Sequence, residues 1–157
     1  MKANLQRPLP MSDQTKMVVT NTTPGIALTS AMDKETANAM RAFIEKVAGH
    51  YDLAGAILFG SRARKTHRPD SDADVAVLLH GRPGKFVSTK LAMDDLAYDV
   101  LLEMGIRIQP LPIWEEEWQH PETYSNPRLL HNIEREGIGS RAIGQGYSGS
   151  IICQTAA

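Results

Sequence analysis

The spacing of hydrophobic residues along the chain changes several times, and each change marks the boundary of a predicted helix or strand. Over residues 31–47, apolar side chains recur at helical spacing with charged residues between them, which predicts an amphipathic helix. Ser30 is placed to cap this helix and Gly49 to end it. Two continuous apolar runs follow at residues 54–59 and 75–79, and their length and flanking turn residues are typical of buried strands.

The second half of the chain repeats the alternation of helix and strand. A helix is predicted over about residues 88–104, a strand over residues 106–113, and a short helix over residues 128–136 that Gly137 ends. Residues 114–119 either form a helix that packs both Trp side chains or a ridge that faces a partner. The order of elements predicts an α/β (α+β) fold in which helices flank a small mixed sheet. In the longer helix the apolar positions are Leu91, Leu96, Leu101 and Leu102, and the acids expected to face outward are Asp94, Asp95 and Asp99.

The length of the chain suits one domain with flexible ends. We expect residues 31–138 to form this domain, residues 1–30 to be a flexible arm or a segment that docks on a partner, and residues 139–157 to be a flexible tail. Residues 1–30 contain no apolar run long enough for a signal peptide or a membrane span, so no membrane contact is expected. The single Cys153 excludes an intramolecular disulfide, and a reducing cytoplasm is the expected location.

Charge restricts the class of partner. The formal net charge of −1 provides no overall positive field, so direct binding of nucleic acid is not expected. Attraction for phosphate must therefore come from a local group of residues. The candidates are Arg62, Arg64 and Lys65, which lie in one basic loop. These side chains either contact a phosphate or are simply exposed to water.

Two acids stand at the start of the second apolar run, opposite a bend that ends the first. In a strand, positions two apart share a face, so Asp72 and Asp74 converge. Crowded carboxylates repel each other unless a cation lies between them, and hard oxygen ligands suit Mg²⁺. Gly60 allows close approach of the backbone to a ligand, and Ser61 is placed to cap a helix whose start would bind an anion. The sequence thus predicts a combined metal and phosphate site.

These residues resemble the signature of the nucleotidyltransferases of the DNA polymerase β superfamily. That signature is a Gly-Ser pair, ten residues and an Asp-x-Asp, and the same spacing separates Gly60-Ser61 from Asp72-Ala73-Asp74 here. Over about residues 31–137 the chain is similar to the small stand-alone group called minimal nucleotidyltransferases. The resemblance implies a nucleotidyltransferase fold, ATP as substrate together with Mg²⁺, catalytic and metal-binding roles for the two acids, and nucleotide binding at the Gly-Ser pair.

One position departs from the pattern that the resemblance implies. Members of the superfamily commonly carry a third carboxylate on the third strand, where it helps to bind metal and acts on the attacking hydroxyl. If Ile106 and Ile108 face the core, Arg107 falls at this position, and a cation there disfavours a second metal ion. Arg107 then contacts a phosphate directly, or it lies on the surface of an edge strand, or the register differs by one residue.

Stand-alone nucleotidyltransferases of about this size, which this chain resembles, are similar to the antitoxins of HEPN/MNT toxin–antitoxin pairs. The resemblance implies a protein adenylyltransferase that transfers AMP from ATP to a hydroxyl of its partner, a HEPN ribonuclease toxin. We expect this acceptor to bring its own binding surface. Two alternatives stay open: an antitoxin of the same fold that neutralises its partner by binding and catalyses little, and a small-molecule nucleotidyltransferase that needs a separate acceptor-binding subunit.

Overall fold

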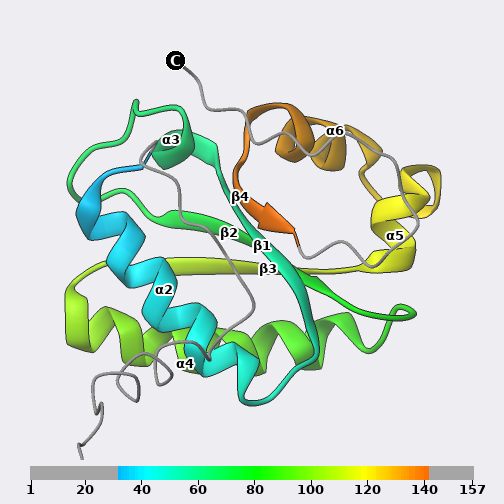
Figure 1. The fold of residues 1–157 in the computed structure, drawn as a ribbon, viewed down its shortest axis with the longest axis horizontal. Helices are drawn as coiled ribbons and strands as arrows, with labels where there is room; N and C mark the ends of the chain where they lie inside the picture. Colours follow the sequence, from blue (N-terminus) through cyan, green and yellow to red (C-terminus); the bar gives the residue numbers. More distant parts are fainter. Residues whose placement is uncertain (1–31, 142–157) are drawn as a thin grey trace, which may run out of the picture.

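A four-stranded mixed sheet forms the centre of the computed structural model, which describes residues 32–141 (Figure 1). Its strands are β1 (Leu53–Phe59), β2 (Ala73–Leu79), β3 (Ile108–Trp114) and β4 (Ile138–Arg141). They lie in the order β3-β2-β1-β4, with β1 antiparallel to both neighbours and β2 parallel to β3. The helices are α2 (Lys34–Ala48), α3 (Gly60–Ala63), α4 (Phe86–Met104), α5 (Glu115–Gln119) and α6 (Pro127–Glu136), with a 3₁₀ turn η1 (Pro121–Thr123). The expected mixed sheet flanked by helices is confirmed.

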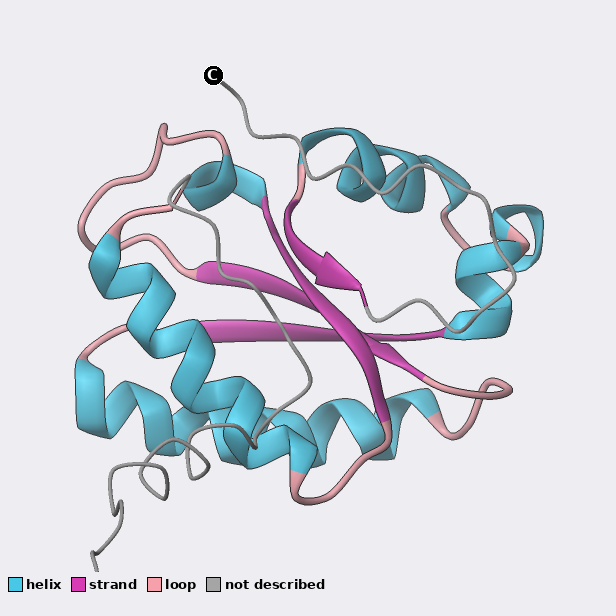
Figure 2. Ribbon diagram, in the orientation of Figure 1, coloured by secondary structure: helices cyan, strands magenta, loops and turns pink. Residues whose placement is uncertain are grey.

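Helices cover the two faces of the sheet unequally, as Figure 2 shows. The long helices α2 and α4 pack against one face, where their apolar side chains join Leu58 and Val75 in the larger core. The shorter α6 covers the other face with Leu130 and Ile133. Because successive side chains of a strand point to opposite faces, Asp74, the neighbour of Val75, lies on the side of α6.

Helix α2 begins later than the sequence pattern suggested. Asp33 is its N-cap and accepts a hydrogen bond from the backbone N–H of Thr36 at 2.8 Å. Ser30, the expected cap, lies outside the described residues. The predicted end is confirmed, since the helix stops at Ala48 and Gly49 is its C-cap.

Helix α4 is rotated about its axis relative to the expected packing. Its buried residues are Met93, Ala97 and Val100, whereas Leu91 and Leu102 are exposed. The helix carries apolar residues on several sides, so their spacing alone does not select the side that is buried. Despite this apolar character, none of the helices within residues 32–141 is long and apolar enough to cross a membrane.

A fourth strand extends the sheet past the boundary expected at residue 138. In the antiparallel pairing of β4 with β1, Gly139 lies opposite Ile57. A Cβ atom at Gly139 would collide with the carbonyl oxygen of Ala56, so the missing side chain permits the close approach of the two strands. Residues 138–141 therefore belong to the sheet and not to the expected flexible tail; the rest of that tail lies outside the described residues.

Candidate active site

The bend after β1 and the start of β2 are in contact. The two strands pair antiparallel with Phe59 opposite Asp74, so the end of one strand lies beside the beginning of the other. Gly60 follows with a φ of +73°, and a Cβ atom there would collide with a carboxylate oxygen of Asp74. The missing side chain at Gly60 therefore makes room for the acid, and the bend and this carboxylate form one site.

Asp72 and Asp74 lie close enough for the charge of one to affect the pKa of the other. Both side chains are half-buried. Burial raises the pKa of Asp74 above its usual value and the negative charge of Asp72 raises it further, while Arg64 acts in the opposite direction. The two carboxylates are thus close enough to repel each other, and a bound cation would relieve this repulsion.

The pair of acids suits a magnesium ion that is held together with substrate phosphates. Mg²⁺ is usually bound by one or two carboxylates, and waters and phosphate oxygens complete its shell. Within residues 32–141, no group of three or more His, Cys, Asp or Glu side chains could hold a metal. The donor set fits an ion whose remaining ligands arrive with a nucleotide.

Gln109, and not Arg107, occupies the position beside the two acids on the third strand. In the parallel pairing of β2 with β3, Gln109 lies opposite Asp74. Its side-chain amide donates a hydrogen bond to Asp72 Oδ2 at 2.9 Å. The expectation that Arg107 replaces the third carboxylate is wrong because the strand begins only at Ile108, which leaves Arg107 exposed ahead of it. A neutral amide therefore stands where the resemblance implies an acid.

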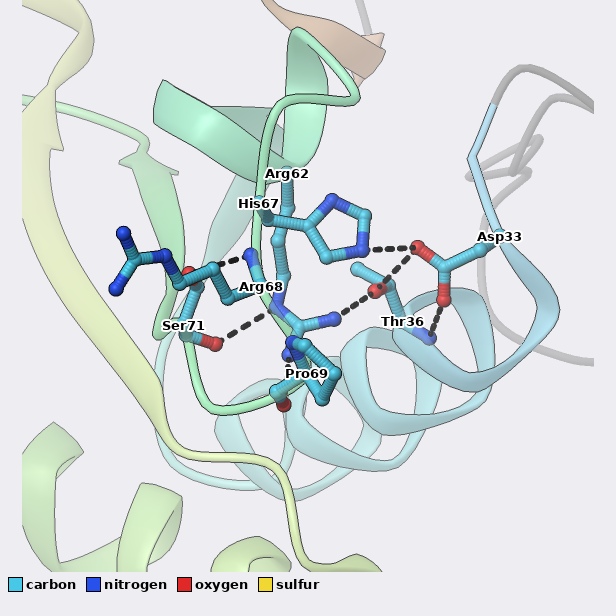
Figure 3. Close-up of polar contacts among 7 residues, drawn as sticks. All are labelled: Asp33, Thr36, Arg62, His67, Arg68, Pro69 and Ser71. Atoms are coloured by element: carbon cyan, nitrogen blue, oxygen red, sulfur yellow. Dashed lines mark hydrogen bonds and ion pairs between the residues drawn. The ribbon is translucent and has the colours of Figure 1, made fainter.

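Arg62 anchors the loop that leads to the acids and does not face outward to a phosphate. Its side chain is 4% exposed and lies between α2 and this loop (Figure 3). The guanidinium donates hydrogen bonds to Thr36 Oγ1 at 2.8 Å, to the carbonyl oxygen of Ser71 at 2.9 Å and to that of Pro69 at 3.2 Å. The phosphate contact predicted for Arg62 is corrected to a structural role, since these bonds fix the backbone just before Asp72.

Asp33 extends this network into the first turn of α2. Its carboxylate accepts hydrogen bonds from the backbone N–H and the hydroxyl of Thr36, at 2.8 and 2.7 Å. Burial works to raise the pKa of Asp33, but the hydrogen bonds from Thr36 and the charges of His67 and Arg62 outweigh it and hold the pKa below its usual value. The sequence analysis did not include Asp33 or Thr36 among the candidates, although an Asp three residues before a Thr at a helix start is a capping pattern.

The remaining residues predicted to bind nucleotide lie around the short helix α3. Phe59 is the N-cap of α3, and Ser61 lies inside the first turn, so Ser61 does not cap the helix as expected. The helix has only four residues, and its dipole is correspondingly small. Arg64 is exposed and forms an ion pair of 3.3 Å with Glu136 of α6. Lys65 is exposed and adopts a φ of +58°. Arg64 and Lys65 are therefore the predicted cations that remain open to solvent.

Comparison with known proteins identifies the family. Residues 43–138 match the family described as polymerase beta, nucleotidyltransferase, and because this is more than half of the chain, the protein belongs to that family. A provisionally assigned nucleotidyltransferase from Sulfolobus solfataricus is similar in structure, with a TM-score of 0.38 and 21% identity, covering 59% of this chain and 85% of that chain. A toxin–antitoxin structure with AMP-PNP gives a TM-score of 0.46 and 18% identity, covering 71% of this chain and 74% of that chain. No curated protein matches the sequence significantly.

Proposed function

We propose that this protein is a Mg²⁺-dependent nucleotidyltransferase that transfers AMP from ATP to a hydroxyl group of a HEPN ribonuclease toxin and so acts as its antitoxin. Membership of the polymerase beta nucleotidyltransferase family supports the type of reaction. The observation that carries the proposal is the contact of the Gly60 bend with Asp74, beside Asp72. Such a site suits a Mg²⁺-bound triphosphate, because the acids bind the ion and the bend permits close approach of the phosphates.

The reaction is a substitution at the α-phosphorus of ATP. The hydroxyl oxygen of the acceptor forms a bond to this phosphorus, the bond to the oxygen that bridges to the β-phosphate breaks, and pyrophosphate leaves with the electron pair. Asp72 and Asp74 would hold Mg²⁺, which supplies neutralisation of the phosphate charge. The proton of the hydroxyl passes to solvent, because the amide of Gln109 cannot take it as a carboxylate would.

Arg64 and Lys65 are the protein cations that we assign to the β- and γ-phosphates. Both follow α3 directly, on the segment that Arg62 anchors. The ion pair of Arg64 with Glu136 is exposed, and exposed pairs of this kind contribute little to stability. A triphosphate carries more charge than one carboxylate, so it can replace Glu136 as the partner of this guanidinium.

The acceptor that we propose is a protein and not a small molecule. A pocket of about 240 Å³ adjoins Gln109 in the described part of the fold. Small-molecule sites typically have volumes above about 300 Å³ and enclose most of their ligand. A protein acceptor brings an ordered surface of its own and needs no enclosing pocket.

Labelling of the partner tests the proposal. Incubation with Mg²⁺, ATP radiolabelled at the α-phosphate and a purified HEPN protein is expected to label the HEPN protein. Asp72→Asn is expected to abolish the label, because it removes one of the two metal-binding carboxylates. Asp70→Asn is the matched control, since Asp70 is exposed in the same loop, and it is expected to keep the label. A label that survives Asp72→Asn would refute the assigned site.

Gln109 supports one alternative, an antitoxin that acts by binding alone. A site without a third carboxylate lacks a group to accept the proton of the hydroxyl. Under this alternative no label forms, and the wild type and Asp72→Asn neutralise the toxin equally well. Labelling of an aminoglycoside in the absence of any HEPN protein would instead favour a small-molecule nucleotidyltransferase.

A further inference from the structure

Helix α4 presents a second apolar face to solvent, in addition to the face that it packs on the sheet. Val87, Leu91, Tyr98 and Leu102 are 68%, 60%, 58% and 67% exposed. At about 100° per residue, these four side chains fall within about 60° around the helix axis. They form one row, which we term the α4 stripe. Single exposed apolar residues are ordinary, but a row of this kind along one helix is typical of a surface that binds another helix.

Acidic side chains flank the α4 stripe on both sides at the middle of its length. Asp94 and Asp95 stand halfway along it. Lys90 neutralises Asp94 through an ion pair of 2.7 Å. Asp95 and Asp99 are exposed, and neither forms an ion pair with another described residue. The surface is thus apolar along its length and negatively charged at its centre.

This distribution of charge discriminates between the possible occupants of the α4 stripe. A second copy of the chain would pair about a twofold axis, and residues at the middle of the stripe would face their own copies, so Asp95 would meet Asp95. Helices that bind lipid surfaces carry Lys and Arg on their polar side, whereas this helix carries acids. A helix of a different protein, apolar along its length with Lys or Arg near its centre, matches both features.

The α4 stripe also adjoins the edge strand that carries Gln109. Tyr98 belongs to the stripe and lines the pocket of about 240 Å³ that Arg107 and Gln109 line as well. Gln109 in turn donates its hydrogen bond to Asp72. We propose that the α4 stripe is the docking surface for a basic amphipathic helix of the acceptor protein, which binds beside the strand that carries Gln109. The inference rests on the proposed function, because it takes the acceptor to be a protein.

A double variant of the α4 stripe tests the docking. Leu91→Ser/Leu102→Ser changes side chains that are already exposed, so the fold is expected to be retained. The KM of AMP transfer to the HEPN protein is expected to rise at least about tenfold, with kcat nearly unchanged. Met104→Ser is the matched control, since Met104 is exposed on the same helix about 130° from the middle of the stripe. An unchanged KM in the double variant would overturn the proposal.

Photo-crosslinking identifies what occupies the α4 stripe. With p-benzoylphenylalanine in place of Leu102 in the full chain, an adduct with the HEPN protein is expected. An adduct with a second copy, or within one chain only, contradicts the proposal. The result also separates the two claims. If an adduct forms but the wild type transfers no AMP, the docking proposal stands and the proposed function fails. If AMP is transferred but no adduct forms, the proposed function stands and the docking proposal fails.

Synthetic peptides test the match of charge without any catalysis. The probe is a fluorescein-labelled amphipathic helix with leucines at helical spacing and arginines at its centre, and the comparison peptide has glutamates at the centre. The arginine peptide is expected to bind the wild type and the glutamate peptide is not. Asp95→Lys/Asp99→Lys is expected to reverse this preference. Equal binding of both peptides to the wild type is the result that rules out the assigned partner chemistry.

Discussion

Replacing Gly60 with alanine tests the contact between the bend and the acid. The residue has a φ of +73°, where an alanine costs about 1–2 kcal/mol, so the free energy of unfolding is expected to fall by that amount. The new Cβ atom would also collide with a carboxylate oxygen of Asp74 and would lie 3.3 Å from its Cγ. To restore a normal contact, the carboxylate must move by on the order of 1 Å. A displacement of that size at a catalytic group lowers the rate by roughly 10²-fold.

Gly105 provides a matched control for this substitution. Its φ of +75° is nearly the same as that of Gly60, but an added Cβ atom would meet nothing within 4 Å. Gly105→Ala is therefore expected to lose a similar free energy of unfolding and to keep its catalytic rate. Urea denaturation measures the first quantity, and transfer of labelled AMP measures kcat/KM. If Gly60→Ala retains the activity of Gly105→Ala, the carboxylate of Asp74 is not held where the reaction needs it, and the assignment of the site fails.

Three further predictions concern the groups around the acids. Arg62→Met is expected to lower the free energy of unfolding by about 3 kcal/mol in urea denaturation, because one buried and two partly buried acceptors lose a charged donor; a loss near zero would mean that the network of Figure 3 does not hold the loop. Asp74→Asn is expected to raise Tm in Mg²⁺-free buffer near neutral pH. Since the folded-state pKa of Asp74 is raised, its ionised form costs stability above that pKa. The advantage of the amide must vanish as the pH falls below the ordinary carboxyl pKa of 3.8, where Asp74 becomes protonated in both states. A pH-independent gain in thermal melts would contradict this explanation. Gln109→Glu restores a carboxylate at the third position and is expected to raise kcat of AMP transfer by about 10²-fold, the usual contribution of a general base; an unchanged kcat would show that proton removal does not limit the reaction.

Local patterns in the sequence were sufficient to predict strands β1, β2 and β3 and the meeting of the bend with the acids. The apolar run up to Phe59 and the one from Val75 differ from their flanking residues within a few positions, and a strand fixes the alternation of its own side chains. The antiparallel pairing of these two strands, which are consecutive in the chain, then brings Gly60 next to Asp74. These features are determined by residues that are close in the sequence, so they can be predicted from the sequence alone.

The features that the sequence analysis missed depend on partners distant in sequence. Arg62 belongs to a basic loop and resembles a solvated side chain, but it is buried because Thr36, 26 residues earlier, accepts its hydrogen bond. The sequence analysis placed Arg107 beside the two acids, whereas the structure places Gln109 there, because the pairing of β3 with β2 decides where β3 begins. The exposed side of α4 could not be predicted because Leu91 and Leu102 are as apolar as the residues that are buried. In each case tertiary packing determines where the side chain lies, which the periodicity of apolar residues does not determine.

The central claim is that Asp72 and Asp74 together hold a magnesium-bound nucleotide against the Gly60 bend. Calorimetric titration of ATP into the protein measures this directly, with and without Mg²⁺, for the wild type and for Asp72→Asn. We expect binding by the wild type that requires Mg²⁺, and at least about tenfold weaker binding by Asp72→Asn, since one of the two carboxylates that bind the ion is lost. Equal affinity of both proteins, or binding by the wild type that is indifferent to Mg²⁺, would contradict the account.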